Sequence, residues 1–169
     1  MPPETQVGAN TFGVTINGRV YVPRTPTGTG IGGSNGQAME LWRASNFSWY
    51  ELEIKDGKSP AGFNMKIHID HLAGVGSILL KQSDFHDQYD SGLFTHIYFK
   101  VWDSNISNYA YYGSVDNQGE INVTRLDSGI FSANFKGKFI RYDNPNEFIQ
   151  ITDGRFDINA FTLPNAVFP

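Results

Sequence analysis

Apolar and polar residues alternate with a period of two along most of the chain. This pattern is typical of strands that turn one face to a core and the other to water. The clearest alternation lies at residues 63–70, FNMKIHID. Other segments with strand patterns are 12–16, 19–22, 47–55, 78–81, 96–102, 109–115, 121–124, 131–139, 149–152 and 155–158. The sequence therefore predicts about ten strands.

Turn signals separate these segments. Asn17-Gly18 and Asp153-Gly154 each stand between two apolar alternations, which indicates two-residue hairpin turns. Asp116–Gly119, Leu126–Gly129 and Asp143–Asn146 are clusters of turn-forming residues.

Two segments fit the strand pattern less clearly. Residues 38–45, AMELWRAS, are the single candidate for a helix. The tail at 161–168 is apolar enough to be a final edge strand.

Turns that recur about every 8–12 residues predict an all-β protein. We expect an antiparallel β-sandwich of about ten strands, with an up-and-down β-barrel as the alternative. The length of 169 residues indicates one domain. We assign residues 11–169 to that domain and residues 1–10, which contain Pro and Gly, to a flexible N-terminal tether.

Composition narrows the possible partners. The net charge is −4 and the 13 basic residues are dispersed, so we expect no nucleic-acid partner. The chain has no cysteine, which excludes thiol catalysis and thiolate metal sites. No apolar run approaches the roughly 20 residues of a membrane helix.

Metal ligation has some support in two places. His68-Ile69-Asp70-His71 offers zinc ligands, but an extended strand points His68 and His71 to opposite faces. Asp84, Asp87 and Asp90 recur in a turn-rich segment, where carboxylates can bind calcium, although the spacing differs from an EF-hand. Solvated side chains explain both patterns more simply, so we predict no metal and no cofactor.

The sequence gives even less support for catalysis than for metal binding. Glu51 and Glu53 share one strand face at roughly 7 Å, a spacing compatible with glycoside hydrolysis but equally typical of a solvated face. No serine stands in a GxSxG motif. We therefore predict that the protein is not an enzyme.

Aromatic residues give the best candidates for ligand binding. Tyr98 and Trp102 share the polar face of their predicted strand, and Trp49 and Tyr111 lie on or near similar faces. Rows of rings on a sheet can stack on sugars or form a protein interface. The competing interpretation is that loops cover these rings as a second apolar cluster.

Two stretches carry a resemblance to a known family. Pro2-Pro3-Glu4-Thr5-Gln6, then residues 8–13, Asn17-Gly18 and Pro23, resemble the start of mature lipoproteins of unknown function from Bacteroidota. Ile151–Asp157 resembles the end of the same domain. The family's lipidation cysteine is absent here, as expected if Met1 replaces a removed leader. The resemblance implies a lipid anchor upstream of residue 1 and a periplasmic or outer-membrane-associated location.

We therefore expect a non-enzymatic cell-envelope protein with a binding or scaffolding role toward an unknown protein or glycan. The first alternative is a carbohydrate-binding module that uses Tyr98 and Trp102. The second is a lipocalin-like carrier of an apolar ligand, which would need a closed barrel with a lined cavity.

Overall fold

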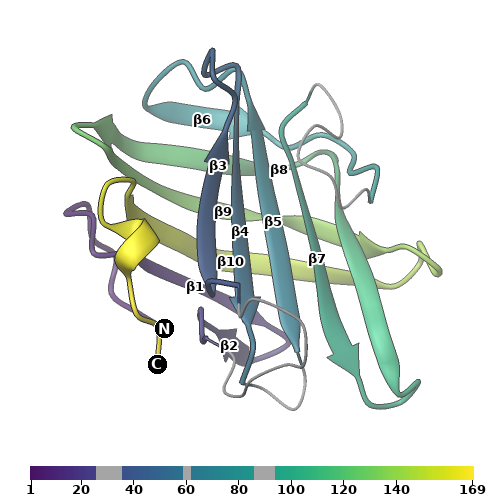
Figure 1. The fold of residues 1–169 in the computed structure, drawn as a ribbon. Helices are drawn as coiled ribbons and strands as arrows, with labels where there is room; N and C mark the ends of the chain where they lie inside the picture. The colour runs from purple at the N-terminus through teal and green to yellow at the C-terminus, as the bar shows by residue number, and fades with distance from the viewer. Residues whose placement is uncertain (26–35, 59–61, 86–93) are drawn as a thin grey trace.

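The computed structural model describes residues 1–25, 36–58, 62–85 and 94–169. Ten strands and one short 3₁₀ helix make up its regular structure (Figure 1). They are β1 (Thr11–Ile16), β2 (Arg19–Tyr21), β3 (Met39–Arg43), β4 (Trp49–Asp56), β5 (Phe63–Asp70), β6 (Gly76–Leu79), β7 (His96–Asp103), β8 (Asn108–Asp127), β9 (Ile130–Arg141), β10 (Phe148–Asn159) and η1 (Leu163–Asn165). The predicted all-β class is confirmed.

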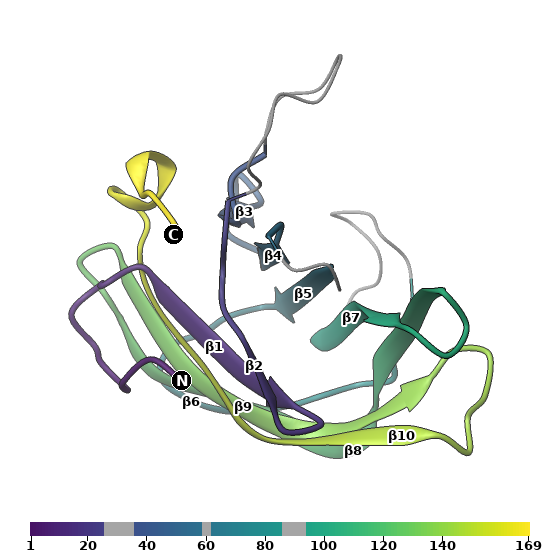
Figure 2. The same cartoon turned by 90° about the horizontal axis from the view of Figure 1, so that it is seen from below.

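All ten strands belong to one antiparallel sheet with the order β2-β1-β10-β9-β8-β7-β5-β4-β3, and β6 pairs with β8 beside this path. The sheet curls into a half-barrel, so that β3, β4, β5 and β7 lie over β1, β9 and β10 (Figure 2). The two layers that we expected from a sandwich are thus two halves of a single sheet. The half-barrel has an inner, concave face and an outer face.

The inner face carries the core. Alternate residues of every long strand meet there, and the buried apolar side chains form one continuous cluster. Rings from the two layers touch: the centroids of Phe99 on β7 and Phe139 on β9 are 5.3 Å apart. Tyr21 on β2 stacks on Phe63 of β5 at 4.6 Å. These contacts fill the interior with side chains, which does not favour the carrier alternative.

One ion pair joins the two ends of the sheet. Arg24, just after β2, donates from Nε and Nη2 to the two carboxylate oxygens of Asp56 at 2.8 and 2.6 Å. A short parallel bridge pairs the same residues, with backbone hydrogen bonds from Arg24 to Lys55 and from Gly57 to Arg24. The fork of the guanidinium matches the carboxylate, and the Asp56 side chain is buried. This bridge partly closes the half-barrel at one end.

Several turns and strands follow the sequence pattern. Asn17 and Gly18 have φ values of 50° and 77°, as the two-residue turn between β1 and β2 requires. Ser128 and Gly129 form the turn between β8 and β9 in the same way. These two predicted turns are confirmed.

Four local predictions are wrong. Residues 39–43 form edge strand β3 instead of a helix, because they pair with β4 from Met39–Ile54 to Arg43–Tyr50. Asp116–Gly119 is an irregularity inside the long strand β8, with a register shift against β9 between Ser114 and Gly119. The tail forms η1 instead of an edge strand, with Pro164 at its first turn and Leu163 buried.

The fourth correction is at Asp153-Gly154, where we expected a hairpin turn. β10 runs straight through this dipeptide, and its register against β9 shifts between Ile151 and Gly154. A Cβ atom on Gly154 would lie 2.3 Å from the ring of Phe135. The glycine therefore marks a bulge that admits a buried ring from the neighbouring strand.

The N-terminal segment lies against the sheet, where we expected a flexible tether. The buried carboxylate of Asp157 accepts hydrogen bonds from the Thr5 hydroxyl at 2.6 Å and from the backbone N–H groups of Val7, Gly8 and Ala9 at 2.9–3.1 Å. Ser132 donates a further bond at 2.7 Å. Burial raises the pKa of Asp157, but these hydrogen bonds outweigh it and the pKa lies below its usual value.

Candidate functional site

The outer face of β4, β5, β7 and β8 carries most of the polar and aromatic side chains singled out from the sequence. Strand pairing arranges them in rows across the sheet. Glu51, His68 and His96 are register partners in one row, and Lys66, Tyr98 and Gly113 are partners in the next. Because alternate residues point to the same face, each row lies opposite the apolar core.

A small cavity opens on this face at β7 and β8. Its volume is about 300 Å³, and the described residues that line it are Asp84, Phe85, Tyr98, Tyr111 and Tyr142. We call it the aromatic cavity. Tyr98 lies on β7 and Tyr111 on β8, while Tyr142 directly follows β9 and its N–H donates to the carbonyl of Tyr111 at 2.9 Å. Two adjacent strands therefore hold Tyr98 and Tyr111, and a backbone hydrogen bond to β8 holds Tyr142, whereas Asp84 and Phe85 lie in the segment between β6 and β7.

The four rings face one another at different angles. Phe85 is nearly perpendicular to Tyr98, at 87° and 6.1 Å, and meets Tyr142 at 61° and 5.1 Å. Tyr98 and Tyr111 are nearly parallel, at 17° and 6.2 Å. Tyr142 is 66% exposed, whereas Tyr98 is 7% exposed. The rings thus form the walls of a hollow, with Tyr142 as its outermost wall.

A glycine allows this arrangement. A Cβ atom on Gly113 would lie 2.8 Å from the ring of Phe85 and 2.7 Å from Cβ of Ser83. Gly113 pairs with Tyr98 on one side and Ile140 on the other. Phe85 can therefore pack directly over the backbone of β8, beside Tyr98.

The structure brings two of the four predicted binding residues together. Tyr98 and Tyr111 line the aromatic cavity. Trp102 lies four residues further along β7 and makes an edge contact with Tyr109 at 5.5 Å. Trp49 is on β4, where it stacks on His68 at 5.8 Å. The predicted set therefore divides into three places on the outer face.

Sequence reasoning missed Phe85, Tyr142 and Asp84 as cavity residues. The sequence pattern indicates Asp84 only as a calcium ligand, and Phe85 stands in a polar segment without strand alternation. Tyr142 follows the last residue of β9 and reaches the cavity because it lies opposite Tyr111. Tyr142 could be identified as a cavity residue only from the pairing of β8 with β9. The alternation of apolar and polar residues does not predict that pairing.

Beside the cavity lies a buried polar row. Nδ1 of His68 donates to Oε2 of Glu51 at 3.2 Å, and Nζ of Lys66 lies 3.7 Å from Oε1 of Glu51. The rings of His68 and His96 stack at 5.3 Å. Among the described residues, Oε1 of Glu51 and Nε2 of His68 have no hydrogen-bond partner. Buried ionisable side chains thus lie close together on the outer face of β4, β5 and β7.

His96 connects this row to the cavity. Its Nδ1–H donates to the carbonyl of Phe94 at 3.0 Å, and its Nε2 lies 3.9 Å from Oδ1 of Asp84. Burial lowers the pKa of His96, and His68 lowers it further, while the Phe94 carbonyl, Asp84 and Glu51 raise it. Burial dominates, so His96 is neutral at neutral pH.

Glu51 and Glu53 do not form a solvated face. Glu51 is 2% exposed and contacts His68 and Lys66. Glu53 is also buried, accepts a hydrogen bond from Asn64 at 3.1 Å and pairs with Lys55 at 3.1 Å. Glu51 is therefore engaged by residues of β5, and Glu53 by Lys55 of its own strand and Asn64 of β5.

The candidate metal ligands are placed apart where the structure describes them. His71 has a φ of 50° at the end of β5, is exposed and contacts Asp70 at 2.8 Å, whereas His68 is buried in the outer layer. Asp87 and Asp90 lie outside the described residues. Within residues 1–25, 36–58, 62–85 and 94–169, no group of three or more metal-ligating side chains comes together.

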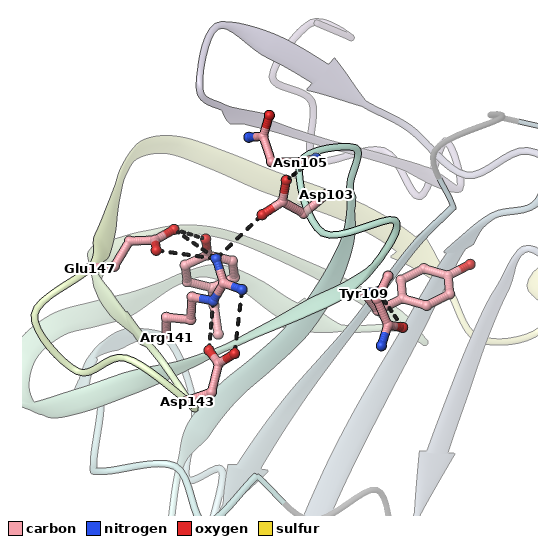
Figure 3. Close-up of polar contacts among 8 residues, drawn as sticks. Asp103, Asn105, Tyr109, Arg141, Asp143 and Glu147 are labelled. Carbon is pink, nitrogen blue, oxygen red and sulfur yellow. Dashed lines mark hydrogen bonds and ion pairs between the residues drawn. The ribbon is translucent and has the colours of Figure 1, made fainter.

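A second charged cluster lies near the ends of β7, β8 and β9 (Figure 3). Arg141 pairs with Asp103, Asp143 and Glu147 at 3.3, 2.6 and 3.1 Å. These ion pairs hold the β9–β10 connection against the β7–β8 turn. They raise the pKa of Arg141, which keeps its charge permanent.

Tyr112 is the register partner of Arg141, and its hydroxyl donates to Glu147 at 2.8 Å. Burial and this bond raise the pKa of Tyr112. The polar groups of this cluster are paired with one another. We regard the cluster as a structural support for the strands that carry the aromatic cavity.

In the described part of the chain, no helix is long and apolar enough to cross a membrane. Comparison of the sequence and structure with protein-family models, curated proteins and solved structures gave no match. The functional assignment therefore rests on the geometry of the chain itself.

Proposed function

We propose that this protein is a non-enzymatic binding protein of the cell envelope and that the aromatic cavity is its ligand site. The observation that carries the proposal is the convergence of four rings and one carboxylate on a hollow of about 300 Å³. Such a volume is at the lower end of the range for ligand sites, and aromatic lining with few polar groups is their usual composition.

The strands and ion pairs that hold the cavity residues in place favour a preformed site. Tyr98 and Tyr111 are fixed on adjacent strands, and the Arg141 cluster holds the segment that bears Tyr142. A site on rigid strands loses little conformational entropy when a ligand binds. The resemblance to lipoproteins, carried by Pro2–Gln6, residues 8–13, Asn17-Gly18, Pro23 and Ile151–Asp157, supports the cell-envelope location, with a lipid anchor upstream and a periplasmic or outer-membrane-associated position.

The test is a screen by nuclear magnetic resonance of the intact protein with ¹³C-labelled aromatic rings. Separate samples contain neutral monosaccharides, amino acids, fatty acids or small organic cations. We expect at least one class to shift the ring signals of Tyr98, Tyr111 and Tyr142. In Tyr142→Ala the signals of Tyr98 and Tyr111 should shift less at the same ligand concentration. Shifts confined to other rings, or none with any class, would contradict the proposal.

A carbohydrate-binding module is the second candidate, favoured by the Trp102–Tyr109 pair. Trp102 is 37% exposed and continues the line of rings along β7 beyond Lys100. An extended glycan could stack along this line. Gel retardation by soluble polysaccharides, lost in Trp102→Ala, would support this function, and equal mobility on every glycan would exclude it.

A further inference from the structure

The shape of the aromatic cavity contains information on the chemistry of its ligand. Phe85 stands at 87° to Tyr98 and at 61° to Tyr142. A flat sugar face stacks best on a single ring or on coplanar rings, whereas steeply inclined walls enclose a compact, rounded group. The negative faces of aromatic rings attract a cation that lies within about 6 Å of their centroids.

The charge of the lining residues also favours a cationic ligand. Asp84 supplies a carboxylate, and no lysine or arginine is among the described lining residues. The charged groups beside Tyr98 and Tyr111 on the packed strands are their register partners, Lys66 and Lys100. Nζ of Lys66 lies 3.7 Å from Glu51, and Nζ of Lys100 lies over the ring of Tyr109. Nε2 of His96 is 3.9 Å from Asp84, with the ring of His68 stacked behind it. Burial keeps His96 neutral at neutral pH, so it adds no positive charge next to the cavity.

The same face already binds a cation with a tyrosine ring. Nζ of Lys100 lies 5.4 Å from the centroid of Tyr109, and Lys100 is the register partner of the cavity residue Tyr111. The chain uses the same contact elsewhere, with Arg19 over Tyr21, Arg43 over Phe47 and Lys138 over Phe148 at 4.5–4.9 Å. Ring faces of this protein are thus repeatedly paired with positive charge.

We propose that the aromatic cavity binds the ammonium head group of a small organic cation. Phe85, Tyr98, Tyr111 and Tyr142 surround the alkylated nitrogen, and Asp84 provides the opposite charge. A volume of about 300 Å³ suits one such head group better than an oligosaccharide chain. This inference rests on the proposed function, because it names the ligand class of the same cavity.

The experiment compares two probes of nearly equal shape by isothermal titration calorimetry with the full chain. Choline carries a trimethylammonium group, and 3,3-dimethylbutan-1-ol replaces it with a neutral tert-butyl group. We expect choline to bind at least about tenfold more tightly, since each desolvated ring–cation contact contributes on the scale of one such factor.

Variants assign the effect to the cavity. Tyr142→Ala should weaken choline binding about tenfold, and its exposed ring makes the substitution compatible with folding. Asp84→Asn should weaken choline binding without changing the binding of the neutral alcohol. Tyr109→Ala is the matched control, because Tyr109 is on the same strand and face as Tyr111 but outside the cavity.

The outcomes separate the inference from the proposed function. Equal binding of the two probes would overturn the cationic ligand while leaving the aromatic cavity as a binding site. Absence of choline binding, together with ring shifts caused by a neutral ligand class, would do the same. If no class shifts the cavity rings, both the inference and the proposed function are wrong.

Discussion

Single residues decide where this sheet bends and what its faces hold. Gly154 admits the ring of Phe135 into a bulge of β10, and Gly113 admits the ring of Phe85 over β8. In both places a missing Cβ atom creates room for an aromatic ring from elsewhere in the chain. Neither role is visible in the local sequence, where Asp153-Gly154 has the composition of a hairpin turn.

Substitution of Gly154 tests this packing role. Gly154→Ala places a Cβ atom 2.3 Å from the Phe135 ring, so the ring or strand must shift, and we expect a loss of about 1–3 kcal/mol in the free energy of unfolding. Urea denaturation measures the change. Gly36→Ala is the control, since its nearest contact is the end of Lys55 at 3.5 Å. Equal stability of the two variants would contradict the bulge as a packing device.

His96 provides a pH-dependent prediction. Its folded-state pKa is lowered, first by burial, so the unfolded chain binds more protons between that value and about 6.5. The contribution of neutral His96 to the free energy of unfolding is therefore fully present above about pH 6.5. It decreases as the pH falls toward the folded-state pKa of His96. We expect the loss of unfolding free energy between pH 7 and pH 5 to be smaller in His96→Gln.

Denaturation curves at the two pH values give this difference. His71→Gln is the matched histidine control, because His71 is exposed at the end of β5. Equal losses of stability on acidification in His96→Gln and the native protein would show that His96 does not cause the pH dependence.

At the scale of elements, the alternation of side chains was sufficient to predict most strands, because one buried face constrains every second residue. It failed where pairing or packing overrides local preference. Residues 39–43 have helix-compatible composition, yet β4 offers them a complete antiparallel partner. Tyr98 and Tyr111 could be chosen from their strands, whereas Tyr142 joins them only through the pairing of β8 with β9.

Asp157 determines the position of the N-terminal segment. Asp157→Ala removes the acceptor of the Thr5 hydroxyl and of three backbone N–H groups, and we expect a loss of about 2–4 kcal/mol in unfolding free energy. Hydrogen exchange of Val7, Gly8 and Ala9 should accelerate. In Asp153→Ala, a change at a more exposed carboxylate of the same strand, these amides should stay protected. Unchanged exchange in Asp157→Ala would show that other contacts hold the segment.

At the scale of the whole molecule, one sheet makes both layers, and the Arg24–Asp56 bridge links its ends. The curl puts apolar side chains inside and leaves the outer face of β4, β5, β7 and β8 for polar and aromatic groups. The β order could not be predicted from the sequence, since long-range pairing has no local signature. The separation of the two faces was predictable, because it follows from the period of two.

The Arg24–Asp56 bridge should contribute strongly to global stability. Arg24→Ala leaves the buried carboxylate of Asp56 without its bidentate partner, and we expect a loss of about 2–4 kcal/mol in thermal or urea unfolding. Lys81→Ala breaks an exposed pair with Asp116 and should cost less than about 1 kcal/mol. Equal losses in the two variants would show that the bridge does not hold the ends of the sheet together.

The inner face of the half-barrel is filled with side chains, while the outer face keeps an accessible aromatic cavity. Paramagnetic relaxation of ring protons by a neutral, soluble gadolinium chelate tests this arrangement in a single measurement. We predict strong relaxation at Tyr142, measurable relaxation at Phe85 and Tyr111, and none beyond background at Phe12, Phe99 and Phe139. Strong relaxation of the three inner rings, or protection of Tyr142, would contradict this arrangement of the two faces.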